Sequence, residues 1–391
     1  MSVVDRFRYV AELSSAGGEP LGAVTLNPDW RPAFEWSLWD GVRHGTLRPL
    51  ARCAHGIVEP QWDEDLGEPH VAGLQTVIET DDPAHPHRAT IPRSYFTAAA
   101  ERESTKLVAS GKLSPGETFR YSISAYSRQD IPEERDAPAM RGTVVEEIVQ
   151  PITLQPGSLN EFLERSSSHT PPGDDHDDMR VLVPHSVIEE TTALVRQAGD
   201  IEIGGVLVGQ LHRDAETDDL FCVVTAQIEG RHTNAAKTSL TFTPDTWAAA
   251  RSALALRNRG EIFVGWWHGH PFWCSKCEPE RRRTCPLSRP FFSRDDVALH
   301  RAVFGRGFDV ALLITNLGED DLACDLFGWR HGMVTRRGYH VTDGPAPAPA
   351  AGAGLAAGDA REPTLSANSH EIATTASGKS DDGATKPAIT Y

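Results

Sequence analysis

The second half of the chain alternates short apolar runs with longer amphipathic stretches, a pattern that predicts strands interleaved with helices. The apolar runs are too short for helices and are typical of buried strands. Helical spacing of apolar residues predicts one helix from Pro184 to Gly199 and another that begins at Thr243 and Pro244. The strands are expected at residues 181–183, 201–209, 221–228, 238–242, 262–266, 309–315 and 322–329. This order predicts an α/β (α+β) domain in which helices flank a mixed sheet.

Residues 1–165 carry a weaker pattern of the same kind. Residues 120–126 alternate as a strand does, and residues 94–110 have the character of a helix. We therefore expect a separate N-terminal α+β domain, in which we find no catalytic set of residues. Four tryptophans supply mass for its core or for a substrate- or partner-binding surface: Trp30, Trp36, Trp39 and Trp62.

Two segments lack periodic apolar residues and are expected to lie outside the folded domains. Residues 166–178 are polar and acidic and contain proline and glycine, which indicates a flexible linker. Residues 341–391 are rich in alanine, proline and glycine and then in serine and threonine, which indicates a disordered tail. Between these segments we expect residues 179–340 to fold as an independent domain.

The apolar run that leads to His268 and His270 carries the first candidate for chemistry. Side chains two residues apart on a strand point to the same face, so the two imidazoles would project side by side from the strand end. Pro271 prevents the pattern from continuing as a central strand. Two histidines at this spacing suit a metal site, and they are equally typical of polar residues at a strand end.

Two carboxylates elsewhere in the sequence complete a candidate site. Ser293 and Asp296 have the spacing of a helix-capping box, and the same helix start would bring a carboxylate to the imidazoles. Two imidazoles and one carboxylate leave a fourth tetrahedral position for water, as in catalytic zinc sites. Glu202 interrupts an apolar run, so it lies at a surface edge, pairs with a partner, or serves a metal-bound water. The neighbouring Gly204 and Gly205 indicate that another backbone packs closely there.

In order and in type of element, these residues resemble the motif of the JAMM (JAB/MPN) zinc metalloproteases. That motif is a strand glutamate, then His-x-His-Pro, then Ser-x-x-Asp. The matching residues are Glu202, His268, His270, Pro271, Ser293 and Asp296. The Phe-Thr-Pro-Asp sequence at 242–245 is also similar to the family, and the resemblance covers about residues 179–340. It implies a cytidine-deaminase-like JAB/MPN fold and a hydrolase similar to bacterial deubiquitinases.

The resemblance also implies a role for each residue of the motif. His268, His270 and Asp296 would hold one catalytic Zn²⁺. Glu202 would be the general base, and Ser293 would donate a hydrogen bond to the tetrahedral oxyanion. The implied reaction is cleavage of an isopeptide or peptide bond after the C-terminal glycine of a ubiquitin-like protein. The implied partners are that protein, its conjugates and other proteins of a ubiquitin-like conjugation operon.

The segment at 271–292 is longer than its counterpart in the family and contains three cysteines. Cys274, Cys277 and Cys285 have the spacing C-x-x-C-x7-C, which favours a structural metal site; redox thiols and merely buried thiols are the alternatives. Three thiolates need a fourth ligand. His300 is expected to supply it, because it lies one turn further along the helix that follows the Ser-x-x-Asp sequence. A second Zn²⁺ is therefore expected.

Composition limits the classes of partner. The chain of 391 residues has 38 basic and 55 acidic residues and a formal net charge of −17, which argues against nucleic acid. We find no secretory signal and no apolar run long enough to span a bilayer, so we expect a cytoplasmic protein without a membrane partner. Two other classes stay open. One is a non-catalytic or partner-dependent MPN scaffold subunit, and the other is a zinc-dependent deaminase, for which an H-x-E sequence is missing.

Overall fold

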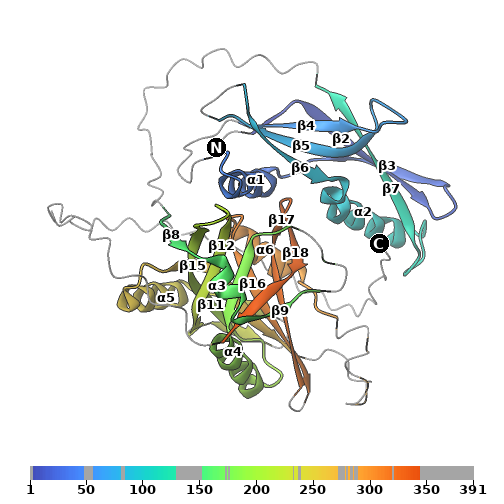
Figure 1. The fold of residues 1–391 in the computed structure, drawn as a ribbon. Coiled ribbons are helices and arrows are strands. Elements are labelled where there is room, and N and C mark those ends of the chain that lie inside the picture. The colour runs from blue at the N-terminus through green and yellow to red at the C-terminus, as the bar shows by residue number, and fades with distance from the viewer. Residues whose placement is uncertain are drawn as a thin grey trace, which may run out of the picture.

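The computed structural model has two units, and the N-terminal unit lies above the C-terminal unit in Figure 1. The N-terminal unit lies within residues 3–128, and the C-terminal unit is built on one large sheet. The described residues are 3–47, 56–80, 84–128, 152–171, 174, 177–231, 233–236, 239–271, 278, 281, 285, 289–318 and 321–343. Among these residues, no helix combines the length and apolar character needed to cross a membrane.

The N-terminal unit combines two small sheets with two helices. One sheet has the order β1-β4-β5-β6 and the other the order β3-β2-β7. Their shared core includes the fully buried Tyr9, Phe34 and Phe96. The helix predicted at 94–110 is present as η1 and α2, and the strand predicted at 120–126 lies in β7. The elements are β1 (Val3–Asp5), β2 (Phe7–Ser15), β3 (Pro20–Leu26), α1 (Arg31–Arg43), β4 (Gly56–Trp62), β5 (Val71–Ile78), β6 (His87–Pro92), η1 (Arg93–Phe96), α2 (Thr97–Ala109) and β7 (Phe119–Ser127).

The C-terminal unit is a curled mixed sheet that carries helices. In the described part of the chain the sheet has the order β18-β17-β16-β15-β11-β12-β10-β19-β9, and β8 adds to β11. Helix α4 packs on β12 and β16, and α5 packs on β12. This confirms the prediction of an α+β domain with a mixed sheet. The strands are β8 (Leu154–Gly157), β9 (Ser166–His169), β10 (Arg180–Pro184), β11 (Gly204–Asp214), β12 (Leu220–Glu229), β15 (Ile262–His270), β16 (Val310–Gly318), β17 (Asp321–Arg330), β18 (Met333–Arg337) and β19 (Tyr339–Thr342).

Helices α4 and α5 agree with the start and stop signals in the sequence. Helix α4 begins after Pro184 and is capped by Gly199 in a positive-φ conformation, as predicted. Helix α5 begins with Pro244 and has a full capping box at Thr243. The elements are α3 (Leu159–Leu163), α4 (His185–Ala198), β13 (Asn234–Ala236), β14 (Ser239–Thr241), α5 (Pro244–Arg257) and α6 (Arg294–Val303).

The structure differs from the expected linker at 166–178. Residues 166–169 form β9, which pairs antiparallel with β19, so the edge of the sheet extends into this segment. Upstream of it, β8 pairs parallel with β11, and Phe162 of α3 is buried against Phe221. The sequence pattern missed these elements because they are short and because β9 is an edge strand of serine and histidine. The C-terminal unit therefore begins before residue 166.

The acidic residues of the same segment bind buried arginines. Asp174 and Asp178 both accept hydrogen bonds from Arg330, at 2.9 Å in each case. Asp177 accepts from Arg43 of α1 at 2.8 Å. A buried guanidinium is costly unless it is paired, so these carboxylates satisfy charges that come from two other parts of the chain. An acidic run that resembles a solvated linker thus joins the two units.

Helix α1 forms the interface between the units and lies between them in Figure 1. Trp36 packs against His331 with ring centres 4.5 Å apart, and Trp39 packs edge-on against Phe308 at 4.7 Å. Gly332 has φ of +75°, and a Cβ there would lie 2.5 Å from the backbone of α1, so the approach requires glycine. Two of the four N-terminal tryptophans therefore serve contact between units, and the independent folding of residues 179–340 stays a prediction.

We expect Phe162→Ala to lower the free energy of unfolding of the full chain by about 3–5 kcal/mol, because it leaves a cavity beside Phe221. Chemical denaturation in urea measures this change. The control is Leu256→Ala, since the Leu256 side chain is 86% exposed, and its effect should stay within about 0.5 kcal/mol. Similar effects of the two substitutions would show that α3 does not belong to the core of the C-terminal unit.

A buried carboxylate lies beside the same interface. Asp309 is fully enclosed, and its Oδ2 accepts a hydrogen bond from the backbone N–H of Arg306 at 2.9 Å. Burial raises the pKa of Asp309 to about 8, and the nearby Glu35 of α1 adds to the rise. Burial also raises the pKa of Glu35, which accepts a hydrogen bond from the Trp39 indole at 3.1 Å. The native protein therefore holds a proton on Asp309 at a pH where the unfolded chain has lost it.

This difference predicts a pH dependence of stability. Between pH 3.8, the ordinary value, and about pH 8, the native state binds more protons at Asp309 than the unfolded state. Stability should fall as pH rises through this window, by at most about 1.4 kcal/mol per pH unit from this group. Asp309→Asn keeps an oxygen for the Arg306 N–H, and it should remove that slope and raise the melting temperature at pH 8. The exposed Asp65→Asn is the control, and an unchanged slope in Asp309→Asn would contradict the assignment.

Candidate metal centre

Strand β15 positions the two histidines. It pairs antiparallel with β11 and parallel with β16, so both of its edges are hydrogen-bonded inside the sheet. His268 and His270 project to the same face, as predicted, and both are buried. Their Nε2 atoms lie 3.0 Å apart. A strand held on both sides gives these imidazoles a fixed backbone.

Helix α6 brings Asp296 to the histidines. The Ser293 hydroxyl accepts the backbone N–H of Asp296 at 3.1 Å, and Asp296 Oδ2 accepts the backbone N–H of Ser293 at 2.7 Å. The capping box therefore exists, and its carboxylate also faces the imidazoles. Asp296 Oδ1 lies 3.5 Å from His268 Nε2, and Oδ2 lies 3.4 Å from His270 Nε2. Asp296 therefore caps the helix start and also faces the two imidazoles.

The three side chains fit a zinc ion. One ligand atom from each lies within 4.8 Å of the other two. A tetrahedral zinc with bonds of about 2.0–2.1 Å needs ligand atoms roughly 3.3–3.4 Å apart. The two Nε2 atoms lie 3.0 Å apart, and each has a different oxygen of Asp296 nearby, Oδ1 at 3.5 Å from His268 and Oδ2 at 3.4 Å from His270. Burial lowers the pKa of His268, which favours the neutral imidazole that binds metals. Burial alone would raise the pKa of Asp296, but hydrogen bonds from His268 and His270 hold it well below its usual range.

Glu202 lies next to His270 across the β11–β15 ladder. The ladder pairs Gly204 with His268, and the N–H of Gly269 donates to the carbonyl of Ile203 at 2.8 Å, so the same register places Glu202 opposite His270. The side chain is buried, and burial raises the pKa of its carboxyl to about 7. The predicted strand at 201–209 begins only at Gly204, so Glu202 precedes the strand.

Two glycines allow the neighbouring strands to approach β11 closely, as the sequence predicted. A Cβ on Gly204 would lie 2.5 Å from the carbonyl oxygen of Trp267, and one on Gly205 would lie 2.2 Å from that of Ile228. Contacts below 3.0 Å would push the strands apart. Gly204 therefore permits the close approach of β11 to β15 that brings Glu202 to the histidines, and Gly205 permits that of β11 to β12.

The sequence reasoning missed an aromatic brace between β15 and α6. The Trp266 ring stacks on His268, with ring centres 4.4 Å apart and planes 11° apart. Its indole N–H donates to Nδ1 of His300 at 3.0 Å, and both residues are fully buried. The described residues offer His268 Nδ1 no hydrogen-bond partner, so stacking on Trp266 orients its ring. A tryptophan two residues before the motif histidine, on the same strand face, was the available signal.

The hydrogen bond from Trp266 occupies one ring nitrogen of His300, the residue predicted as the fourth ligand of the second zinc. Burial lowers the pKa of His300 to about 3, so its ring is neutral, and Nδ1 accepts the Trp266 proton. Only Nε2, which has no hydrogen-bond partner among the described residues, is left for a metal. Cys285 is buried, whereas Cys274 and Cys277 lie outside the described residues. The structural zinc site stays a prediction.

Comparisons with known proteins leave the family open. The chain matches no known family, and it matches no curated protein. Among solved structures, it is similar to the solution structure of protein DSY2949 from Desulfitobacterium hafniense. The identity is 19%, the TM-score is 0.27, and the match covers 42% of this chain and 94% of that one. A likeness this low carries no argument about fold or function.

The brace can be tested by Trp266→Phe, which keeps a ring against His268 and removes the indole N–H. The change leaves Nδ1 of His300 buried and unpaired, so we expect a loss of about 1–3 kcal/mol in the free energy of unfolding. The control is Trp247→Phe, because Trp247 belongs to the same aromatic cluster and its indole makes no hydrogen bond to a described residue. Denaturant titration of both variants should separate them, and equal losses would mean that the hydrogen bond contributes nothing.

Proposed function

We propose that this chain is a zinc-dependent JAMM-type isopeptidase or peptidase that cleaves after the C-terminal glycine of a ubiquitin-like protein. The observation that carries the proposal is the spacing of the His268, His270 and Asp296 ligand atoms within 4.8 Å of one another. The sequence resemblance to the JAMM motif adds to it. The mixed sheet, with the histidine strand in its interior and the aspartate at the start of a helix, is compatible with a cytidine-deaminase-like JAB/MPN fold.

The donor set supports a catalytic site more than a structural one. Structural zinc sites are closed by four protein ligands, whereas catalytic sites use three and keep a position open. Among the described residues, the cluster of candidate ligands contains two imidazoles and one carboxylate. Glu202 lies beside this cluster and is a second acidic group with a different environment. Its burial suits it to exchange a proton near neutral pH.

Each residue then has a distinct task. His268, His270 and Asp296 hold the ion, which when bound supplies a Lewis acid that acidifies water and polarises the scissile carbonyl. Glu202 takes the proton of the attacking water and delivers it to the leaving amine, a contribution of about 10²–10⁴ in rate. The Ser293 hydroxyl accepts the Asp296 N–H, which leaves its own proton to donate to the oxyanion.

The substrate class follows from the resemblance and is part of the proposal. A ubiquitin-like protein would present its C-terminal tail as an extended segment, and an amine would leave when the bond after its last glycine is cleaved. The partners are that protein and its conjugates, with other proteins of the same conjugation pathway. The alternative is a scaffold role without catalysis, and the following experiments distinguish the two.

We expect the purified chain to carry two zinc ions, one at each predicted site. Asp296→Ala should lose one ion and all hydrolysis of a ubiquitin-like fusion, because it removes a ligand. The neighbouring Asp295→Ala is the matched control, since this carboxylate is exposed on the same turn of α6 and should change neither. Cys277→Ser should lose the other ion and lower stability. Elemental analysis that finds the same zinc content in wild type and Asp296→Ala would refute the catalytic site.

Glu202→Gln separates the base from the metal ligands. The amide has the size of the carboxyl but cannot take a proton, so we expect unchanged zinc content and an unchanged melting temperature. Single-turnover hydrolysis of a ubiquitin-like fusion should slow by about 10²-fold or more. Hydrolysis at the wild-type rate would exclude Glu202 as the general base, while the zinc content would still report on the site itself.

A further inference from the structure

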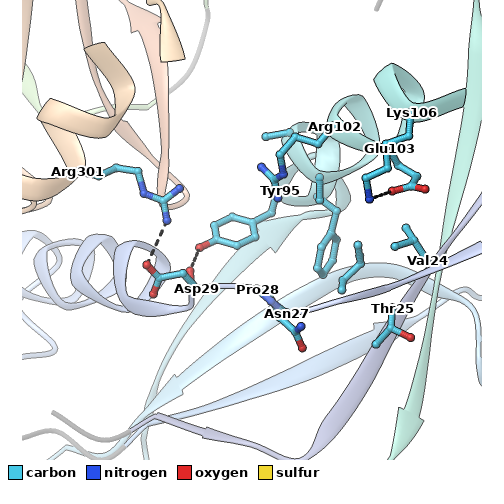
Figure 2. A pocket seen from close by; sticks show the side chains of 14 residues that line it. Val24, Thr25, Asn27, Pro28, Asp29, Tyr95, Arg102, Glu103, Lys106 and Arg301 are labelled. Atoms are coloured by element: carbon cyan, nitrogen blue, oxygen red, sulfur yellow. Dashed lines mark hydrogen bonds and ion pairs between the residues drawn. The ribbon is translucent and has the colours of Figure 1, made fainter. Parts of the chain in front are cut away.

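A groove crosses the N-terminal unit beside its contact with α6. It has a volume of about 370 Å³ and lies between the end of β3 with the loop that follows, helix α2, and one residue of α6. Figure 2 shows the side chains that line it, with Tyr95 and Arg301 directed toward Asp29 from opposite sides. The Tyr95 hydroxyl donates to the carbonyl of Asp29 at 2.5 Å, and Arg301 lies 3.3 Å from its carboxylate. These contacts close one end of the groove.

One wall of the groove is the edge of a strand. It is lined by Val24, Thr25 and Leu26 in succession, although successive side chains of a strand point to opposite faces. A cavity that touches three residues in a row therefore meets the backbone edge of the strand. Strand β3 ends its sheet and pairs only with β2 within the described chain. Its outer N–H and C=O groups are available to a further strand.

The opposite wall is one face of α2 with small and basic side chains. Ala98, Ala99, Arg102, Glu103 and Lys106 line it, and their spacing is that of a single helical stripe. The two alanines leave room beside the strand edge. Lys106 pairs with Glu103 at 2.7 Å, whereas the exposed Arg102 makes no hydrogen bond or ion pair with a described residue. A free guanidinium is suited to bind a carboxylate through two parallel hydrogen bonds.

We propose that this groove binds an extended, acidic segment of a partner protein, which adds as a strand to β3 and places a carboxylate on Arg102. Backbone hydrogen bonds to β3 supply affinity that does not depend on sequence, and Arg102 selects for negative charge. The chain as a whole has a formal net charge of −17, so most of its surface repels an acidic segment. The groove is then a local positively charged site, so an acidic segment binds there in preference to the rest of the surface.

The bound segment would lie close to the candidate metal centre. Arg301 at the end of the groove and Asp296 at the centre stand on the same helix, five residues and about 7.5 Å of helix rise apart. Arg294, at the start of α6, acts electrostatically on Glu101 of α2, so the two helices also approach each other there. The proposal concerns binding and holds whether or not the metal centre is catalytic.

The test measures binding of short fluorescein-labelled peptides to the full chain by fluorescence anisotropy. A peptide of alternating valine and glutamate should bind, and one of alternating valine and lysine should not. Two acidic peptides carry N-methyl groups on complementary sets of alternate amides, because only one set faces β3 in an added strand. We expect one of these peptides to lose at least about tenfold in affinity and the other to bind nearly as the parent does. Amide exchange of residues 20–27 should slow when the parent peptide binds.

Two matched substitutions locate the site. Arg102→Glu should weaken binding of the acidic peptide by about tenfold or more. Arg251→Glu should leave it unchanged, because it reverses the charge of an exposed arginine on α5, away from the groove. Asp296→Ala should also bind normally, which separates this site from the metal centre. The proposal is overturned if no peptide binds, if both methylated peptides bind as the parent does, or if Arg102→Glu has no effect.

Discussion

The close antiparallel pairing of β11 with β15 is the constraint on which the candidate site depends. It fixes His268 and His270 on a strand that is hydrogen-bonded on both sides, and its register carries Glu202 to the position opposite His270. Gly204 permits this pairing, because a side chain there would meet the carbonyl of Trp267, and Gly205 permits the pairing of β11 with β12 on its other side. The remaining candidate ligand, Asp296, comes from α6, which the hydrogen bond between Trp266 and His300 ties to the same strand. The candidate ligands, the candidate base Glu202 and the Trp266–His300 contact therefore all depend on the β11–β15 ladder.

Much of this arrangement was readable from the sequence, since it rests on local rules. The two-residue period of a strand placed both histidines on one face, and the capping spacing placed Asp296 in the first turn of a helix. The glycine pair correctly indicated a close backbone approach. These inferences need only neighbours in sequence and a known period, which is why the positions of the candidate ligands follow from the sequence.

Other features depend on partners that are distant in sequence, and no local sequence pattern predicts them. The acidic residues Asp174, Asp177 and Asp178 looked like a solvated run, because the arginines that they bind lie in α1 and at the end of β17. Trp36 and Trp39 could equally have filled a core or bound a partner until His331 and Phe308 were placed beside them. The Trp266 brace was missed for the same reason, since its acceptor is on another element.

The ion pairs of this chain differ in their exposure to solvent, and salt therefore acts on them unequally. Arg330 and Asp178 are 11% and 18% exposed, whereas Arg301 and Asp29 at the end of the groove are 42% and 37% exposed. Mobile ions screen exposed charges over about 8–10 Å at ordinary ionic strength and reach enclosed charges far less. Rising salt thus loosens the end of the groove while the contacts between the acidic segment and Arg330 persist. Ionic strength therefore weakens the pair at the end of the groove more than it weakens the pair of Arg330 with Asp178.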